Sequence, residues 1–333
     1  MERTSLPDSF GRVAKKLRIQ VTDRCNFRCD FCMPEDPVWL DRAEVLSFEE
    51  TARIAGVLAG MGVEKIRLSG GEPLVRRDLE RLVGLLTRID GIKSVGLTTN
   101  GSFLKEKARV LKDSGLSGVT VSVHSLKPDQ FGAITGTSGM LPRVLEGLRE
   151  AKAVGLDPLK VNCVVMKGKN EGEIGDFVAM AHREEICVRF IEYMPFDGKR
   201  FWDVGSVVGG SEILKRAKEA FDLTPLPREK GATATVYAFA DGSPGRVGVI
   251  PSMTSPFCSD CDRIRLTADG RIVPCLFSRN EYDIRALLRR GATDDEIASF
   301  VRKSFWLKPE GVAAMIRQSV EFGRVRPMYT IGG

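Results

Sequence analysis

Two groups of three cysteines have the residue type and spacing to bind metal. The first group, Cys25, Cys29 and Cys32, reads Cys-x3-Cys-x2-Cys. Three thiolates at this spacing can hold three corners of an iron–sulfur cube, whose fourth iron then stays open to another molecule. A zinc ion with its fourth ligand elsewhere, or a set of reduced structural thiols, is the alternative. We favour the cluster because this spacing is specific.

The second group consists of Cys258, Cys261 and Cys275. Asp269-Gly270 predicts a two-residue hairpin turn ahead of Cys275. Pairing outward from that turn sets Cys275 opposite Ile264, within reach of Cys261. A zinc ribbon would need a second Cys-x2-Cys, which Cys275 does not supply. We therefore favour a second cluster with an open iron, and a zinc site is again the alternative.

The other metal ligands are scarce, which excludes several classes of enzyme. The chain of 333 residues has eight cysteines but two histidines, His124 and His182. This nearly excludes His-rich zinc hydrolases and His-ligated iron or copper enzymes, and it leaves few bases for a catalytic triad. Cys163 and Cys187 lie in apolar runs, so we expect both to be buried as small hydrophobic residues.

Charge and hydropathy narrow the class of protein further. The net charge of +6 favours an anionic partner without choosing between nucleic acid and a phosphorylated small molecule. The longest uncharged stretches fall short of the ~18 residues of a membrane helix, and the N-terminus shows no secretory signal. We expect a cytoplasmic protein whose grouped cysteines serve metal or redox chemistry rather than disulfides.

Six β-like runs alternate with helical patterns between residues 17 and 194, and these elements must position the cysteines. The alternation predicts a parallel sheet with right-handed crossovers, and six units are too few for a full eight-fold barrel. We expect an α/β fold with a partial, six-unit βα barrel of the TIM type over residues 11–195, and a doubly wound sheet is the rival. The expected strands are Leu17–Val21, Ile66–Ser69, Ser94–Thr98, Gly118–Val123, Leu159–Val165 and Cys187–Tyr193, with helices near 48–61, 78–89, 104–114, 142–154 and 173–184.

The pattern changes after residue 195. We interpret residues 196–333 as a smaller α+β region that closes one side of the barrel. Its expected elements are a helix at 211–221, strands at Thr235–Phe239, Val247–Ile250, Arg263–Thr267 and Arg271–Pro274, and helices near 283–290 and 294–303.

Four of the expected strands carry a basic residue between apolar neighbours: Arg18, Arg67, Lys160 and Arg189. Side chains alternate between the faces of a strand, so these cations line the barrel interior if their neighbours pack under the helices. Buried charges need a partner, and acids in these strands are sparse, with Glu192 the main one. The interior is therefore expected to be electropositive and suited to a polyphosphate. The chain has no Gly-x4-Gly-Lys-Ser/Thr loop, so side chains would hold the phosphates.

Three turn motifs follow expected strands at the end where barrel active sites form. They are Gly70-Gly71-Glu72-Pro73, Thr98-Thr99-Asn100-Gly101 and Glu192-Tyr193-Met194-Pro195. Each alone could be an ordinary turn. Their shared location indicates a site at the carboxyl ends of the strands.

These motifs together resemble a known family. The first triplet, with Phe31 before its last cysteine, resembles the signature of the radical S-adenosylmethionine superfamily, and Gly70-Gly71-Glu72-Pro73 resembles its methionine-binding motif. The second triplet, the run from Cys261 to Thr267 and the terminal Gly332-Gly333 are similar to the GTP 3′,8-cyclase family of molybdenum cofactor biosynthesis. The resemblance runs from about residue 11 to residue 333.

The resemblance implies an enzyme with two 4Fe–4S clusters, held by Cys25, Cys29 and Cys32 and by Cys258, Cys261 and Cys275. One electron from an external reductant would cleave S-adenosylmethionine to a 5′-deoxyadenosyl radical, which would abstract the ribose C3′ hydrogen of GTP. The C3′ radical would then add to guanine C8. The product would be 3′,8-cyclo-7,8-dihydro-GTP, which passes to a cyclic pyranopterin monophosphate synthase.

The same resemblance assigns site residues. Gly71, Ser122 and Met194 match contacts of S-adenosylmethionine, and Phe31 flanks its adenine. The positions that match GTP contacts are Arg18, Arg67, Thr98, Lys160, Arg263 and Arg265, with Arg189 as a further phosphate contact. Arg18, Arg263, Arg265 and the tail Gly332-Gly333 would take part in catalysis. The sequence departs from the family at Val123-His124, where many members have Leu-Asp.

Two alternatives lie outside this assignment. Another radical S-adenosylmethionine enzyme with an auxiliary cluster could modify peptides, but it would need a peptide-binding module, and it would leave the interior cations unexplained. A non-enzymatic zinc or iron–sulfur protein could bind nucleic acid through its positive charge. The family assignment predicts neither nucleic-acid nor membrane binding, and a homodimer is compatible with it.

Overall fold

The computed structural model describes residues 4–197, 202–317 and 326–332. Within these ranges, no helix has the length and apolar character that crossing a bilayer requires. Twelve strands of the described residues form one sheet, in the order β12-β11-β10-β1-β2-β3-β4-β5-β6-β9-β8-β7.

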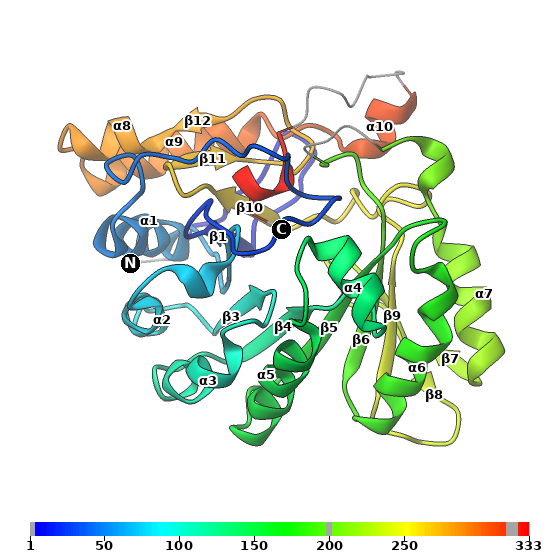
Figure 1. Ribbon diagram of the computed structural model, residues 1–333. Coiled ribbons are helices and arrows are strands. Elements are labelled where there is room, and N and C mark those ends of the chain that lie inside the picture. Colours follow the sequence, from blue (N-terminus) through cyan, green and yellow to red (C-terminus); the bar gives the residue numbers. More distant parts are fainter. Residues whose placement is uncertain (1–3, 198–201, 318–325, 333) are drawn as a thin grey trace.

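The first half of the chain builds six βα units. Strands β1 to β6 pair in parallel in chain order, and their helices cover the outside of the sheet (Figure 1). The strands are β1 Lys16–Gln20, β2 Lys65–Ser69, β3 Ser94–Thr99, β4 Gly118–Ser122, β5 Leu159–Val165 and β6 Cys187–Glu192. The helices are α1 Phe48–Gly60, α2 Leu79–Thr87, α3 Leu104–Asp113, α4 Pro128–Thr135, α5 Leu141–Ala153 and α6 Ile174–Arg183. The predicted partial barrel is confirmed.

The second half of the chain extends this sheet at both edges. Strand β9 pairs in parallel with β6, and β10 pairs in parallel with β1. Each open edge of the six parallel strands carries unpaired backbone groups, and each therefore receives one strand of the predicted smaller region. The elements are α7 Gly210–Ala220, β7 Leu223–Pro225, β8 Thr235–Phe239, β9 Arg246–Ile250, β10 Arg263–Leu266, β11 Arg271–Val273, β12 Tyr282–Asp283, α8 Ile284–Arg289, α9 Asp294–Trp306 and α10 Val312–Arg317.

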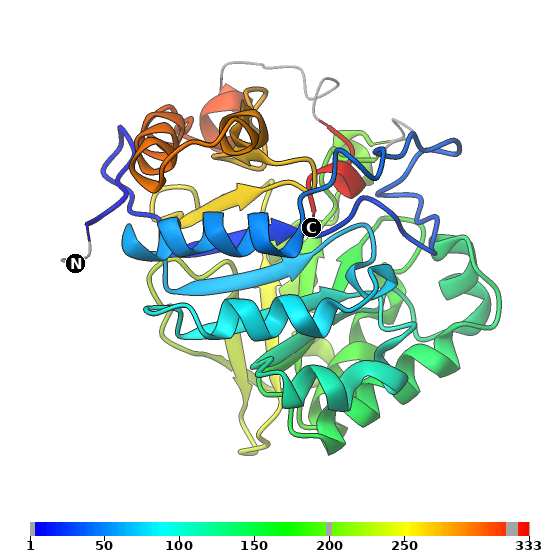
Figure 2. The same ribbon diagram turned by 90° about the vertical axis from the view of Figure 1, so that its left-hand side faces the viewer.

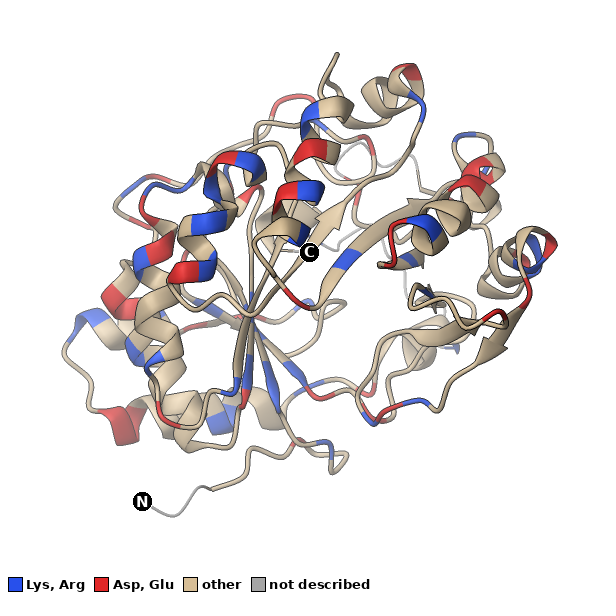
Figure 3. Cartoon of the chain, turned by 90° about the horizontal axis from the view of Figure 1, so that it is seen from below, with Lys and Arg blue, Asp and Glu red and all other residues tan. Residues whose placement is uncertain are grey.

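Alternation along the strands separates the apolar core from the barrel interior. Leu17 and Ile19 of β1 are at most 1% exposed, and Ile66 and Leu68 of β2 are at most 3% exposed. The helices lie over this apolar face, as α1 does beside the sheet in Figure 2. The cation between each apolar pair faces the other way. Seen from below, several strands are coloured for Lys or Arg, whereas the outer helices carry both signs of charge (Figure 3).

Local sequence signals explain where individual helices begin. The predicted capping box forms at α1, where Ser47 Oγ accepts from the Glu50 N–H at 3.0 Å and the Glu50 carboxylate accepts from the Ser47 N–H at 2.8 Å. Helix α4 was not predicted, because its eight residues are too short to show a periodic pattern. Its last turn nevertheless matters, since the carbonyl oxygens of Ile134 and Thr135 hold the loop that carries the first triplet.

Candidate active site

The first cysteine triplet lies in the loop that follows β1, at the carboxyl ends of the barrel strands. Cys25, Cys29 and Cys32 are partly exposed, and all three line one pocket. The Arg28 N–H donates to the Thr135 carbonyl oxygen at 2.8 Å, and the Cys32 N–H donates to the Cys29 carbonyl oxygen at 3.0 Å. The loop is thus fixed to α4 and folded back on itself, with its thiols turned toward the pocket.

Burial dominates the surroundings of the thiols in the first triplet, and the charge of Arg28 opposes it to a smaller extent at Cys25. Burial raises the pKa of Cys25 to about 11, and the charge of Glu72 adds to the effect. Burial raises the pKa of Cys29 and of Cys32 further, and neighbouring cysteine thiols contribute to both. The triplet therefore stays protonated at neutral pH until a metal displaces its protons.

The glycines after β2 fit the triplet loop closely. A Cβ on Gly71 would lie 2.3 Å from the Asp23 carbonyl oxygen and 2.4 Å from that of Arg24, so no larger residue fits. The Gly71 N–H also donates to the Thr22 carbonyl oxygen at 2.7 Å. Gly70 and Gly71 both line the pocket. The expected close approach is present, and it joins the loops after β1 and β2.

Glu72, whose role sequence reasoning missed, ties the loop after β2 to the end of β3. Its carboxylate accepts hydrogen bonds from the Thr99 hydroxyl at 2.6 Å, the Asn100 N–H at 2.6 Å and the Leu74 N–H at 2.9 Å. Burial raises the pKa of Glu72 to about 7, and these hydrogen bonds act against that rise. The sequence feature that could have predicted this role is an acidic residue in an otherwise apolar turn, directly after Gly71. Glu72 fixes the end of β3 beside the triplet.

The second triplet lines the same pocket from the opposite half of the chain. Cys258 and Cys261 lie in the loop before β10, and Cys275 lies just after β11. Within the described residues, no group of three or more His, Cys, Asp or Glu side chains is arranged to hold a single metal ion. A cube places each thiolate on a different iron, so its ligands stand further apart than those of one zinc ion. The donor chemistry fits clusters, because all six pocket-lining groups of the two triplets are free cysteine thiols, the ligands that iron–sulfur clusters take.

The hairpin beside the second triplet differs by one residue from the predicted register. Strand β10 pairs Arg265 with Val273 and Leu266 with Ile272, so the predicted partnership of Cys275 with Ile264 is wrong. The cause is the length of the turn. Three residues, not the predicted two, lie between the paired residues Thr267 and Arg271, and the last of them, Gly270, has φ +71°. The thiol of Cys275 still lies close enough to Cys261 for their charges to interact.

Two cations surround Cys261, in contrast to the first triplet. Arg263 donates to Cys261 Sγ at 3.2 Å, and Lys308 Nζ lies 3.4 Å from the same sulfur. Burial raises the pKa of Cys261, but the charges of Arg263 and Lys308 outweigh burial and bring it down to about 6. Lys308 is 2% exposed, and sequence reasoning missed it because a lysine after a surface helix carries no local signal. Burial raises the pKa of Cys275.

The interior cations lie where strand alternation predicted them. Arg18 and Arg189 line the pocket, and so do Arg263 and Arg265 from the second half of the chain. Arg67 and Lys160 are not pocket-lining residues in this structure. The Arg67 guanidinium lies across Gly96, where a Cβ would come within 2.8 Å of it.

The hydrogen-bond partners of these cations are neutral groups or a cysteine. Arg67 donates to the Leu97 carbonyl oxygen at 3.0 Å, and Arg189 donates to Asn162 Oδ1 at 2.9 Å. The Arg18 side chain has no hydrogen bond or ion pair with any described residue. Burial lowers the pKa of Arg18 well below its usual value, and the nearby arginines lower it further. The interior therefore holds uncompensated positive charge.

Glu192 does not neutralise the interior cations. Its carboxylate accepts from the N–H groups of Gly210 and Met253, each at 2.6 Å, and from the N–H and hydroxyl of Thr254. It thereby fixes the loops that follow β6 and β9. This leaves the interior more electropositive than the sequence alone indicated.

Cys187 also faces this interior, contrary to expectation. Cys163 is 1% exposed, as predicted, but Cys187 is partly exposed. Cys187 shares its strand face with Arg189 and pairs with Lys160 of β5. Its apolar neighbours predicted burial. Because side chains alternate between the two faces of a strand, however, every second residue of β6 points into the barrel.

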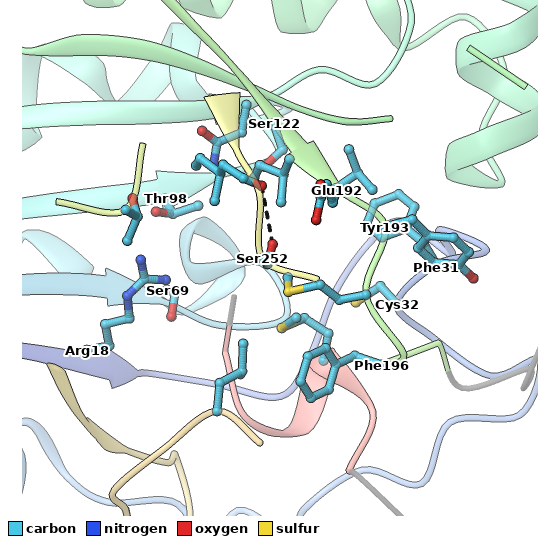
Figure 4. Close-up of a pocket in the computed structure, with 18 of the residues that line it drawn as sticks. Arg18, Phe31, Cys32, Ser69, Thr98, Ser122, Glu192, Tyr193, Phe196 and Ser252 are labelled. Atoms are coloured by element: carbon cyan, nitrogen blue, oxygen red, sulfur yellow. Dashed lines mark hydrogen bonds between the residues drawn. The ribbon is translucent and has the colours of Figure 1, made fainter. Parts of the chain in front are cut away.

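The residues expected to contact S-adenosylmethionine also reach the pocket. Phe31, Gly71, Ser122 and Met194 line it, and so does Thr98 from the GTP set. In Figure 4, Arg18, Ser69 and Thr98 lie on one side of the pocket, whereas Phe31, Tyr193 and Cys32 lie on the other. The pocket thus has a cationic side and an aromatic side that carries a cysteine.

The C-terminal tail lies over the ends of β1 and β10. Arg265 donates to the Gly332 carbonyl oxygen at 3.1 Å, and Gln20 Nε2 donates to the Tyr329 carbonyl oxygen at 2.6 Å. A Cβ on Gly332 would lie 2.6 Å from Ser69 Oγ, and its φ is +80°, so glycine is required there. Gly333, the other tail residue expected at the site, lies outside the described residues.

Comparison with known proteins agrees with this geometry. The family model for the radical SAM superfamily matches residues 19–181, and the model for Molybdenum Cofactor Synthesis C matches residues 186–314. A GTP 3′,8-cyclase of Thermodesulfovibrio yellowstonii is 42% identical over 98% of this chain and 100% of that protein. The chain belongs to the GTP 3′,8-cyclase family. Another family protein, from Aquifex aeolicus, is 40% identical over 98% of this chain and 100% of its own length.

More distant relatives extend the comparison beyond bacterial proteins and to solved structures. Human molybdenum cofactor biosynthesis protein 1 is 39% identical over 98% of this chain, which spans 51% of that longer protein. The structure of SuiB from Streptococcus suis bound to S-adenosylmethionine aligns with a TM-score of 0.60 and 16% identity, over 95% of this chain and 73% of SuiB. At that identity the likeness shows the radical SAM fold alone. Membership of the family makes this chain an enzyme, which removes the non-enzymatic alternative.

Proposed function

We propose that this chain converts GTP to 3′,8-cyclo-7,8-dihydro-GTP, the first step of molybdenum cofactor biosynthesis, in the pocket between its two cysteine triplets. The observation that supports this most is that both triplets and a set of uncompensated cations line one pocket. A buried cation without a carboxylate needs an anionic ligand. The triphosphate of GTP supplies one, whereas a neutral peptide segment does not.

The two triplets would hold different groups. Cys25, Cys29 and Cys32 would hold the 4Fe–4S cluster common to the superfamily, and S-adenosylmethionine would lie beside Phe31, Gly71, Ser122 and Met194. The chemistry that these bound groups supply is one-electron reductive cleavage, which yields the radical that starts cyclisation and requires an external reductant. Cys258, Cys261 and Cys275 would hold a second cluster, which would bind the guanine base.

Between the two sets, the side chains of this chain bind and orient the substrate. Arg18 and Arg189 would neutralise the phosphates from within the pocket, with Arg67 and Lys160 behind them. Thr98 would donate a hydrogen bond on the same side. The ribose would then lie between the two triplets, which is where hydrogen abstraction and attack on the base must both occur.

Arg263, Arg265 and the tail would act nearest the base. Arg265 already holds the Gly332 carbonyl oxygen, so the tail and this arginine form one unit. We propose that the tail at Gly332 excludes water from the pocket while the ribose is a radical, and Gly333 stays a predicted catalytic residue. Residues 11–195 would supply the radical chemistry, and residues 196–333 the second cluster and the tail. The product would pass to a cyclic pyranopterin monophosphate synthase.

An anaerobic incubation with GTP, S-adenosylmethionine and dithionite tests the proposal. We expect equimolar 5′-deoxyadenosine and cyclised nucleotide, both measured by mass spectrometry. Guanosine should bind at least about 100-fold more weakly than GTP, because it loses several charge-assisted hydrogen bonds. Equal affinity for guanosine and GTP would contradict the phosphate role of the cations. Release of 5′-deoxyadenosine without cyclised nucleotide would contradict the proposed reaction.

A further inference from the structure

His124 is a buried imidazole on the aromatic side of the pocket. It follows β4 by two residues, is 5% exposed and lines the pocket. Its ring lies edge-to-face against Phe31, with the ring centroids 4.5 Å apart. Its backbone carbonyl oxygen accepts from Asn170 Nδ2 at 2.7 Å. The position of the imidazole is therefore fixed from both ends.

One ring nitrogen of His124 is already engaged. The Val164 N–H donates to Nδ1 at 3.1 Å, so Nδ1 must be the unprotonated nitrogen. Burial lowers the pKa of His124 to about 4, which keeps the ring neutral at physiological pH. In the neutral ring the proton then lies on Nε2. This N–H has no hydrogen-bonding partner among the described residues.

His124 Nε2 is not among the fully buried side-chain atoms that lack a partner, so its N–H is open to the pocket and can donate to a ligand there. The small exposed part of His124 faces the pocket that it lines. The cations that would attract phosphate lie on the other side, with Arg18, whereas Phe31 and Tyr193 lie on this side (Figure 4). A neutral N–H donor beside an aromatic ring suits an uncharged acceptor on a flat or sugar-like group. The adenosyl part of S-adenosylmethionine has such acceptors in its ring nitrogens and ribose oxygens.

We propose that His124 is a further substrate-binding residue, whose Nε2–H donates a hydrogen bond to the adenosyl group of S-adenosylmethionine. This rests on the proposed function, in which the aromatic side of the pocket binds that molecule. The position is also where the sequence departs from the family's usual Leu-Asp. The proposal therefore assigns a role to a residue that the family resemblance did not explain.

Two isosteric variants separate this role from a structural one. The His124→Asn side chain can still accept from the Val164 N–H, because its amide oxygen lies near the position of Nδ1, but it has no donor at the position of Nε2. The His124→Gln side chain has a donor near the position of Nε2 and loses the acceptor for Val164. Both variants are made in the full chain, loaded anaerobically with iron and sulfide. The dissociation constant for S-adenosylmethionine is measured by equilibrium dialysis, with that for GTP and the thermal midpoint as controls.

We expect H124N to bind S-adenosylmethionine roughly five- to tenfold more weakly, as the loss of one hydrogen bond predicts. H124Q should stay within about twofold of the unaltered protein, since one hydrogen bond is kept. Neither variant should change GTP binding. Unaltered binding by H124N, or equal weakening in both variants, would overturn the donor role. Failure of the unaltered protein to bind S-adenosylmethionine would overturn the proposed function as well, which distinguishes the two failures.

Discussion

The two cysteine triplets have the same ligand types but opposite electrostatic surroundings. At the first triplet, burial outweighs the charge of Arg28 and the hydrogen bonds to the thiol, and the pKa of Cys25 rises to about 11. At the second, Arg263 and Lys308 overcome burial and the pKa of Cys261 falls to about 6. The first loop is fixed by backbone contacts to α4, whereas the second is surrounded by buried cations. The difference lies in the residues around the thiols.

This comparison teaches how each triplet balances its charge. At the first triplet, Arg28 lowers the pKa of Cys25 by less than burial raises it, so bound iron must supply most of the counter-charge. At the second triplet the protein supplies two positive charges before any metal binds. Hydrogen bonds and charge near cluster sulfurs also help to set reduction potentials. We therefore expect the two sites to differ in chemistry as well as in position.

The largest expected effect separates the two triplets by activity. Cys29→Ala should lose both cleavage of S-adenosylmethionine and cyclisation, because the first triplet is where radical chemistry begins. Cys261→Ala should lose cyclisation but keep uncoupled cleavage. Each variant should retain about four of about eight iron atoms per chain. Iron analysis and assay of 5′-deoxyadenosine measure both.

Cys163→Ala is the matched control, since Cys163 is buried and is not among the residues that line the pocket. It should keep the full iron content and both activities. Two results would contradict the assignment of different roles to the triplets. One is loss of S-adenosylmethionine cleavage in a Cys261→Ala protein that keeps four iron atoms, and the other is stoichiometric zinc in place of iron at either triplet.

A smaller effect tests the electrostatic contrast in cluster-free protein. The thiolate is the form that iodoacetamide alkylates, so the rate rises as pH rises through the pKa. Cys261 should reach half its maximal rate near pH 6, and Cys25 near pH 11. Lys308→Met should raise the midpoint of Cys261 by about one pH unit or more, because it removes a buried charge. Peptide mapping by mass spectrometry assigns each rate to its cysteine.

Lys303→Met is the control, because Lys303 lies in the last turn of α9, five residues before Lys308, and is exposed. It should leave the midpoint of Cys261 unchanged. Similar midpoints for Cys25 and Cys261 in the unaltered protein would remove the contrast between the triplets. Circular dichroism spectra are recorded at each pH to check that the cluster-free protein stays folded, and only rates from folded protein are compared.

Much of the fold could be predicted from the sequence, because the signals were local and periodic. The alternation of β1 to β6 with helices fixed the partial barrel, and the parity of Arg18, Arg67 and Arg189 placed cations inside it. The capping box at Ser47 and Glu50 formed as expected. The three cysteines of each triplet were also expected to lie together, and all six line the pocket. Cysteines that are joined by short loops have little room to lie apart.

What could not be predicted depends on contacts between distant segments. Lys308 reaches Cys261 across 47 positions in the sequence, and Gln20 reaches the Tyr329 carbonyl oxygen across 309. The register at Cys275 depended on a turn whose length Asp269-Gly270 does not determine alone. Cys187 was expected to be buried because its neighbours in the sequence are apolar, but its own side chain faces the barrel interior.

The most direct test of the two-site account is the effect of each ligand on each cluster alone. Electron paramagnetic resonance spectra are recorded for reduced protein in which Cys25, Cys29 and Cys32 are all replaced by Ala, and for protein in which Cys258, Cys261 and Cys275 are replaced. We predict that GTP changes the spectrum when the first triplet is absent and S-adenosylmethionine does not, with the reverse when the second triplet is absent. Two results would contradict the account. One is a spectrum that GTP leaves unchanged in the protein without the first triplet, and the other is a spectrum that changes with GTP and not with S-adenosylmethionine in the protein without the second triplet.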